Sequence, residues 1–119
     1  MKVTVPISVG ELIDKITILE IKALFTDNDY IHKELEELNK IKSTITQYTL
    51  DYEIKLKTVN ETLWKIENKI RAKEKLQEFD DEFIELARSV YKTNDERARI
   101  KNSINQLCKS EYKEIKIYE

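Results

Sequence analysis

The sequence is short of backbone breakers and of the residues that build common metal and redox sites. Its 119 residues include one Gly, one Pro, one Cys and one His. A single Cys excludes an internal disulfide, and one Cys with one His excludes a zinc site of the usual four-ligand kind. A carboxylate site for a hard cation would remain, but the sequence singles out none, so we expect neither metal nor cofactor. So few Gly and Pro residues in a chain that is 37% charged favour long helices.

The chain also lacks a charge excess and a long apolar run. Its 21 basic and 23 acidic residues give a net charge of −2, which is not the basic footprint of a nucleic-acid binder. No apolar run approaches the ~20 residues of a membrane span. The opening MKVTVPISVGEL turns polar too early for a signal peptide. We therefore expect a soluble, cytoplasmic protein with no nucleic-acid or membrane partner.

The hydrophobic periodicity predicts four helices in a single helical domain, residues 1–119. The first helix should begin with a capping box, in which the Ser8 hydroxyl and the Glu11 carboxylate bond the amides of the first turn. It should run to about residue 25. KTND (92–95) could cap a new helix, but the apolar residues keep one phase across it, so we favour one long helix to about residue 108. The predicted N-caps are Ser8, Asn28 or Asp29, Asp51 and Asp80.

Two short segments at the ends of the chain have a strand pattern. KVTVPIS (2–8) and KEIKIYE (113–119) alternate apolar with polar or small residues. Because two such short strands are marginal alone, we expect them to pair with each other. The predicted fold class is mainly α, an antiparallel four-helix bundle-like domain with a small two-stranded β-pair formed by the N- and C-terminal segments.

Several polar side chains fall on faces that should be buried. At ~100° per residue, Glu20 projects between Ile13 and Ile16 on the larger of two apolar faces of the first helix. The third helix carries a polar stripe with spacings of 4, 3 and 4 residues, and the fourth helix carries another. These stripes and their flanking residues are Asn60, Trp64, Glu67 and Arg71, then Arg88, Tyr91, Asn94, Arg97, Lys101 and Asn105.

These residues have two interpretations. A carboxylate buried alone costs several kcal/mol or loses its charge, so Glu20 and Glu67 need partners among Arg71, Arg97 and Lys101. The set is either a closed ion network that fixes helix register or a pocket beside the two aromatic residues of the stripes. Three cations against two acids would suit a small anionic ligand.

No residue is singled out for catalysis. The free amides near Gly10 could hold a phosphate, but the capping box uses them. The sequence indicates no Ser–His–Asp triad around its single histidine, His32. Glu20 or Glu67 could act as a general acid or base, but the sequence indicates no substrate for them. We therefore expect a non-enzymatic binding or accessory protein that forms a homo-oligomer, a dimer, or binds a helical partner, through the second apolar face of the first helix. The alternative is a small anionic-ligand binder or enzyme that uses the interior polar cluster.

Four blocks of the sequence resemble a known family. SVGELIDKITILEIK, NETLWKIENKIR, FIELARSVYKTNDERARIKNSIN and EYKEIKIY are similar to the blocks of a family of short bacterial and phage proteins of unknown function. The likeness is weakest between residues 26 and 52, and Asn68 stands where the family usually has an Asp. The resemblance implies a soluble helical protein and no activity.

Small all-helical chorismate mutases are similar in principle only. They hold a dianion with interior Arg, Lys and Glu side chains. The first helix here offers Lys15 and Lys22 on its polar side and no Arg.

Overall fold

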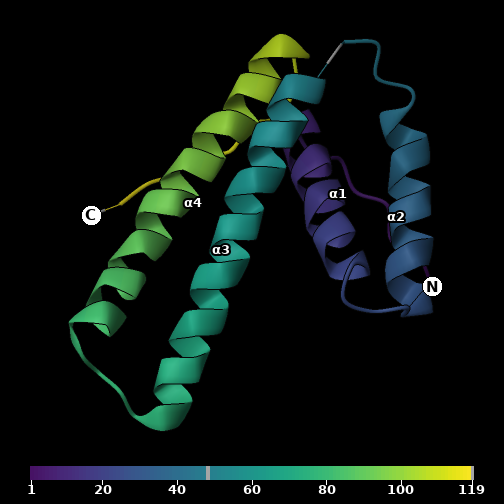
Figure 1. Ribbon diagram of the computed structural model, residues 1–119. Coiled ribbons are helices and arrows are strands. Elements are labelled where there is room, and N and C mark those ends of the chain that lie inside the picture. The colour runs from purple at the N-terminus through teal and green to yellow at the C-terminus, as the bar shows by residue number, and fades with distance from the viewer. Residues whose placement is uncertain (48, 119) are drawn as a thin grey trace.

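The computed structural model describes residues 1–47 and 49–118, and this part of the chain forms four α-helices (Figure 1). They are α1 (Val9–Ala23), α2 (Asp29–Lys42), α3 (Leu50–Leu76) and α4 (Asp81–Leu107). The last two form a long antiparallel hairpin, and α1 lies against the half of it that contains the start of α3 and the end of α4. Within the described residues, α2 packs against α1 and contacts α3 through the Lys42–Glu53 ion pair at 3.2 Å, whereas α1 packs against all three other helices. That residues 1–119 form a single domain stays a prediction.

Short polar side chains start the helices as the sequence predicts. The Ser8 hydroxyl accepts a hydrogen bond from the Glu11 amide at 3.0 Å. The side chain of Asn28 caps α2, and that of Asp80 caps α4. Each cap satisfies an amide that has no partner inside its own helix. Three of the predicted N-caps are therefore confirmed.

Two helix boundaries differ slightly from the prediction, and one is confirmed. α3 begins at Leu50, so its N-cap is Thr49 rather than Asp51. The hydroxyl of Thr49 donates a hydrogen bond to Glu53 at 2.6 Å, so the helix begins earlier in the chain than predicted. α1 ends at Ala23, two residues before the predicted end. α4 is continuous over 27 residues, as its unbroken apolar phase predicts.

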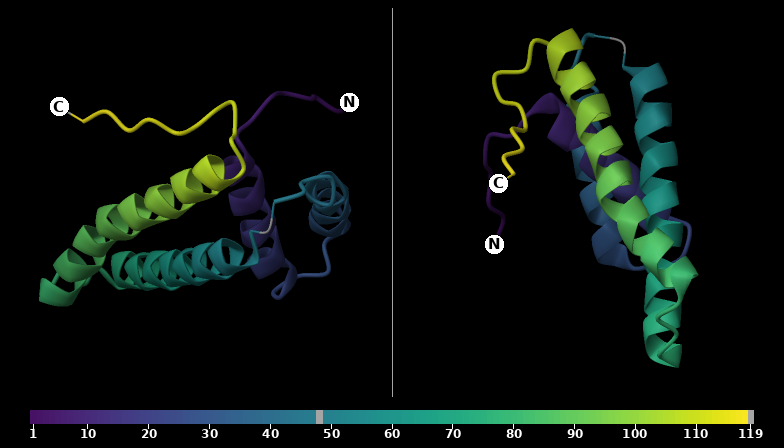
Figure 2. Two further views of the ribbon diagram at one scale, coloured as in Figure 1. Left: turned by 90° about the horizontal axis from the view of Figure 1, so that it is seen from above. Right: turned by 90° about the vertical axis from the view of Figure 1, so that its left-hand side faces the viewer.

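The predicted β-pair is wrong. Residues 1–47 and 49–118 contain no strand, and the two terminal segments leave from neighbouring points and diverge, as the left view of Figure 2 shows. Lys2 ties the N-terminal segment to Glu37 of α2 at 2.7 Å. Asn102 of α4 donates a hydrogen bond to the carbonyl of Glu114 at 3.2 Å. Because side chains of different helices hold the two segments, their backbones do not meet to form a ladder.

The core is small and lies at one end of the hairpin. Ile13, Leu56 and Ile104 are fully buried where α1, α3 and α4 meet. The buried residues of α3 and α4 fall within residues 56–60 and 98–105, and the described segment 61–97 contains none. None of the helices in the described ranges is both long enough and apolar enough to cross a bilayer. The same end of the hairpin also buries the polar side chains described next.

Candidate functional site

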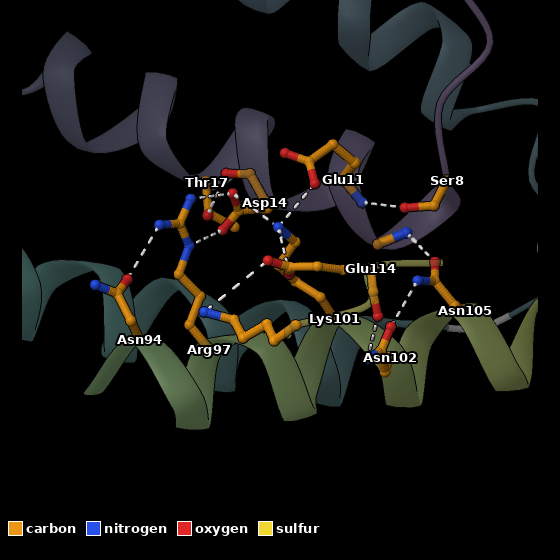
Figure 3. A network of polar contacts seen from close by, with 12 residues as sticks. Ser8, Glu11, Asp14, Thr17, Asn94, Arg97, Lys101, Asn102, Asn105 and Glu114 are labelled. Carbon is orange, nitrogen blue, oxygen red and sulfur yellow. Dashed lines mark hydrogen bonds and ion pairs between the residues drawn. The ribbon is translucent and has the colours of Figure 1, made fainter. Parts of the chain in front are cut away.

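Asp14 is a buried acid on α1, and two other helices supply its partners. Its side chain is 2% exposed. Its Oδ1 accepts hydrogen bonds from Asn60 Nδ2 of α3 and from Arg97 Nε of α4, both at 2.9 Å. Its Oδ2 accepts a third from Arg97 Nη2 at 2.5 Å (Figure 3). The planar guanidinium thus bonds both carboxylate oxygens at once, which is the strongest geometry available to this pair.

The residues that bind Asp14 make further hydrogen bonds with their own neighbours. The hydrogen bond from Arg97 to Asp14 raises the pKa of this Arg, so its guanidinium stays charged in the protein interior. Asn60 Nδ2 also donates to Thr17 Oγ1 at 2.9 Å, and the Thr17 hydroxyl donates to the Asp14 carbonyl at 2.8 Å. Arg97 also donates to Asn94 at 3.5 Å. The buried charges are therefore compensated by direct hydrogen bonds.

Lys101 is the other cation of the cluster, and three acids surround it. Its side chain is 6% exposed. Its Nζ lies 2.8 Å from a carboxylate oxygen of Glu11, 3.3 Å from one of Glu114 and 4.0 Å from one of Asp14 (Figure 3). The Glu11 carboxylate, predicted to complete the capping box, reaches across to this ammonium instead. α1 and the C-terminal segment are thus both linked to α4 through one lysine.

The start of α1 is held by the end of α4. Gly10 N donates to Asn105 Oδ1 at 2.6 Å, and Val9 N donates to Ser110 Oγ at 3.1 Å. A Cβ atom at Gly10 would lie 2.4 Å from the Lys101 carbonyl oxygen, so only glycine permits this approach. Residues of α4 and the turn after it therefore occupy the amides that a phosphate would need.

The structure brings together part of the set predicted from the sequence. Asn60, Asn94, Arg97, Lys101 and Asn105 lie in the polar cluster around α1. The others lie outside it: Trp64 stacks on Phe25 with ring centroids 5.4 Å apart, Arg88 pairs with Glu85, and Glu67, Arg71 and Tyr91 are exposed.

The prediction of a buried Glu20 among Arg71, Arg97 and Lys101 is wrong. Its side chain is 40% exposed, and its carboxylate lies 3.7 Å from Lys57. Glu20 projects from the last turn of α1. The prediction failed because a helical projection ranks the faces of a helix by their apolar content alone. The face that meets the basic residues of α4 is a different one.

That face carries the residues that the sequence reasoning missed. Gly10, Asp14, Thr17 and Ile21 recur at spacings of 4, 3 and 4 residues, so they form one stripe on α1. Small residues at two of these positions let α4 and α3 approach closely. The stripe was a usable signal for Asp14 and Thr17. The sequence contains no such signal for Glu114, because the position of this residue depends on how the C-terminal segment folds back onto α4.

The charges of the cluster differ from the expectation. Glu11, Asp14 and Glu114 oppose Arg97 and Lys101, so acids exceed bases by one where the sequence predicted excess positive charge. In the described ranges, every buried side-chain nitrogen and oxygen has a hydrogen-bond partner. No group of three or more His, Cys, Asp or Glu in the same ranges is placed to hold a metal ion. The geometry therefore supports the closed-network interpretation over a preformed anion pocket.

Comparison with known proteins identifies a family and transfers no activity. No curated protein and no solved structure matches the chain. A family model does match, over residues 1–119, and its description assigns no function. The predicted membership of a family of unknown function is thereby confirmed. The chain belongs to the family of unknown function DUF6165.

Proposed function

We propose that this protein is a non-enzymatic interaction protein that associates with a second copy of itself. The observation that carries the proposal is an apolar groove beside α2. The proposal keeps the cytoplasmic location that the sequence predicts. It leaves the buried polar cluster a structural role, which is to hold α1 on the hairpin.

Two interior side chains that could support chemistry, Asp14 and Cys108, are poorly placed for it. Both oxygens of Asp14 accept hydrogen bonds from Asn60 and Arg97, so neither is free to accept a proton from a substrate. Burial raises the pKa of the Cys108 thiol, which keeps it protonated near neutral pH and makes it a poor nucleophile. These features favour a binding role over catalysis.

The groove lies between the N-terminal segment, α1 and α2, with a volume of about 700 Å³. Val3, Val5, Ile7 and Ile41 are exposed there. The apolar side chains that line it are Val3, Val5, Ile7, Val9, Leu12, Leu38, Ile41 and Ile45. A contiguous apolar surface of this kind is typical of an interaction site. It replaces the second apolar face of α1, which carries Ile18, Ile21 and Phe25, as the candidate interface, because Ile21 is buried.

The shape of the chain favours a second copy as the occupant. The radius of gyration is 16.1 Å, whereas a compact domain of this length has about 13.5 Å. In the described ranges nine apolar side chains are buried, and α2 buries none of its residues despite an apolar stripe. A symmetric dimer is the commonest way for a small chain to bury further surface.

The charges at the groove also suit a second copy. Two ion pairs flank it, Lys2 with Glu37 at 2.7 Å and Lys15 with Glu34 at 3.0 Å. Each pair is neutral in sum, so two copies of this face would meet without a large electrostatic repulsion.

Sedimentation velocity over a concentration series tests the proposal. The wild-type chain should sediment as a dimer at high concentration. Ile41→Glu places a carboxylate in the groove and should weaken the dimer at least about tenfold, because burying an unpaired charge is costly. Circular dichroism should show unchanged helix content, since Ile41 is 49% exposed in the single chain.

Ile84→Glu is the matched control. Ile84 is also a helical isoleucine, 52% exposed, but lies on α4 near the far end of the hairpin. This variant should keep the wild-type dimer. A wild-type chain that stays monomeric at every concentration contradicts the proposal, and so does equal weakening by both variants.

A further inference from the structure

The C-terminal segment covers a buried lysine, and in its described residues the polar contacts to the rest of the chain come from Glu114. Residues 111–118 form neither helix nor strand, and within the described ranges they make no backbone–backbone hydrogen bond. Seven of these eight residues are exposed, and Glu114 is the exception. Its carbonyl accepts a hydrogen bond from Asn102, and its carboxylate lies 3.3 Å from Lys101 Nζ.

The partners of Lys101 differ in how firmly they are held. Glu11 and Asp14 belong to α1, which is locked to α4 by the Arg97 hydrogen bonds and by the contacts of Gly10. Glu114 belongs to the exposed segment. If the segment leaves, Lys101 loses one carboxylate, and the remaining two acids balance the two cations. One carboxylate from elsewhere would then restore the original arrangement.

A cavity beside Glu114 has the chemistry to hold such a group. Its volume is about 480 Å³, and it lies between the end of α4 and the C-terminal segment. Asn102, Gln106, Lys109 and Lys113 line it, and among the described residues of the lining Glu114 is the only acid. Ammonium and amide groups donate hydrogen bonds to carboxylates. The volume falls within the range of small-ligand sites.

We propose that residues 111–118 act as a displaceable strap, and that Glu114 occupies the place of a carboxylate ligand on Lys101. The ligand carries clustered carboxylates, because Lys109, Lys113 and Glu114 line the same cavity. When the ligand binds, one of its carboxylates replaces that of Glu114 at Lys101, so the buried cluster keeps its charge. The strap thereby sets the apparent affinity of the protein for this ligand, since only the fraction of molecules in which the strap has left Lys101 can bind it. This inference is independent of self-association through the groove at α2.

Isothermal titration calorimetry with two probes, citrate and a tetraglutamate peptide, tests the exchange. Glu114→Gln weakens the strap, and Asn102→Ala with Glu114→Gln removes both of its attachments. The double variant should bind a probe about fivefold to tenfold more tightly than the wild type, in proportion to the larger open fraction. A gain for citrate alone identifies a small polycarboxylate as the ligand, and a gain for the peptide alone identifies an acidic protein segment.

The controls separate the exchange from a general change in charge. Glu111→Gln makes the same charge change in the same segment at an exposed position, and it should leave binding unchanged. Lys101→Met in the double variant should abolish the gain. Because that change can unfold the chain, Lys109→Met at an exposed position serves as a second loss-of-binding variant. Equal binding by the double variant and the wild type overturns the proposal, and so does an equal gain from Glu111→Gln.

Discussion

The two halves of the α3–α4 hairpin share one hydrophobic pattern and differ in what covers them. Leu56 in the half nearest α1 is fully buried. Leu63 and Ile66 continue the same stripe along α3 but are only partly buried. Two helices bury only the seam between them, and a third helix is needed to enclose their side chains. Burial in this molecule is therefore decided by where α1 lies.

The charged residues show the same contrast. Lys73, near the hairpin tip, has its ammonium within 4 Å of three acids, Glu78, Asp80 and Glu82, at 3.5, 2.9 and 3.4 Å. All three acids are exposed to water, where an ion pair contributes little. Lys101 has a similar set of carboxylates, but it is buried under α1. Losing a partner there leaves a charge without water to solvate it.

The largest expected effect follows from removing the buried acid. Asp14→Ala leaves Arg97 without either of its carboxylate hydrogen bonds. Breaking a buried ion pair in this way costs about 3–5 kcal/mol in the free energy of unfolding. Urea denaturation followed by circular dichroism measures the loss.

Glu20→Ala is the control on the same helix. Its carboxylate is 40% exposed and its partner Lys57 lies 3.7 Å away, so the change should stay within about 0.5 kcal/mol. Equal losses from the two variants would contradict the assignment of Asp14 as the interior acid of α1.

A second, smaller effect is expected at Gly10. Glycine inside a helix ordinarily costs about 1 kcal/mol relative to alanine, so Gly10→Ala should stabilise an isolated α1. In the folded chain the new Cβ would overlap the Lys101 carbonyl oxygen at 2.4 Å. We expect a net loss of about 1–3 kcal/mol, as for an overpacked core. A gain in stability, measured in the same denaturation, would show that α1 and α4 are farther apart.

Much of the fold was predictable because its signals are local. The caps at Ser8, Asn28 and Asp80 depend on a hydroxyl, amide or carboxylate next to an apolar period. The continuity of α4 follows from a phase that never breaks. The end segments were mispredicted because an alternating pattern shows that a strand is compatible with the sequence, and a ladder also requires a partner backbone in register.

The site was only partly predictable because it depends on which faces meet. Arg97 and Lys101 follow from polar residues that interrupt the apolar stripe of α4. The sequence predicts a buried Glu20 and makes no prediction for Asp14, because a helical projection shows how apolar each face is and cannot show which neighbour it meets. The small residues Gly10 and Thr17 mark the face of closest approach, which is the better guide to a buried partner for a basic helix.

The smallest expected effect concerns the ion pair between Lys73 and Asp80 at the exposed tip of the hairpin. The hydrogen bond from Lys73 holds the pKa of Asp80 below its usual value, and the Phe83 amide lowers it further. Because the folded-state pKa is lowered, this interaction contributes stability above the unfolded-state pKa of Asp80. The contribution is lost as the pH falls through the lower, folded-state value. Below that pH, amides at the hairpin tip should exchange with solvent faster than they do above it.

An NMR titration of the carboxyl groups measures this pKa directly. Lys73→Met should move the pKa of Asp80 upward, and only part of the way, because the Phe83 amide still donates to the carboxylate at 2.9 Å. Glu37 is an internal reference, since its pKa is lowered by Lys2 at the other end of the molecule. Its titration should be the same in both proteins. An unchanged pKa of Asp80 in the variant would mean that the ion pair at the tip does not form in solution, and that the distal half depends on helix capping alone.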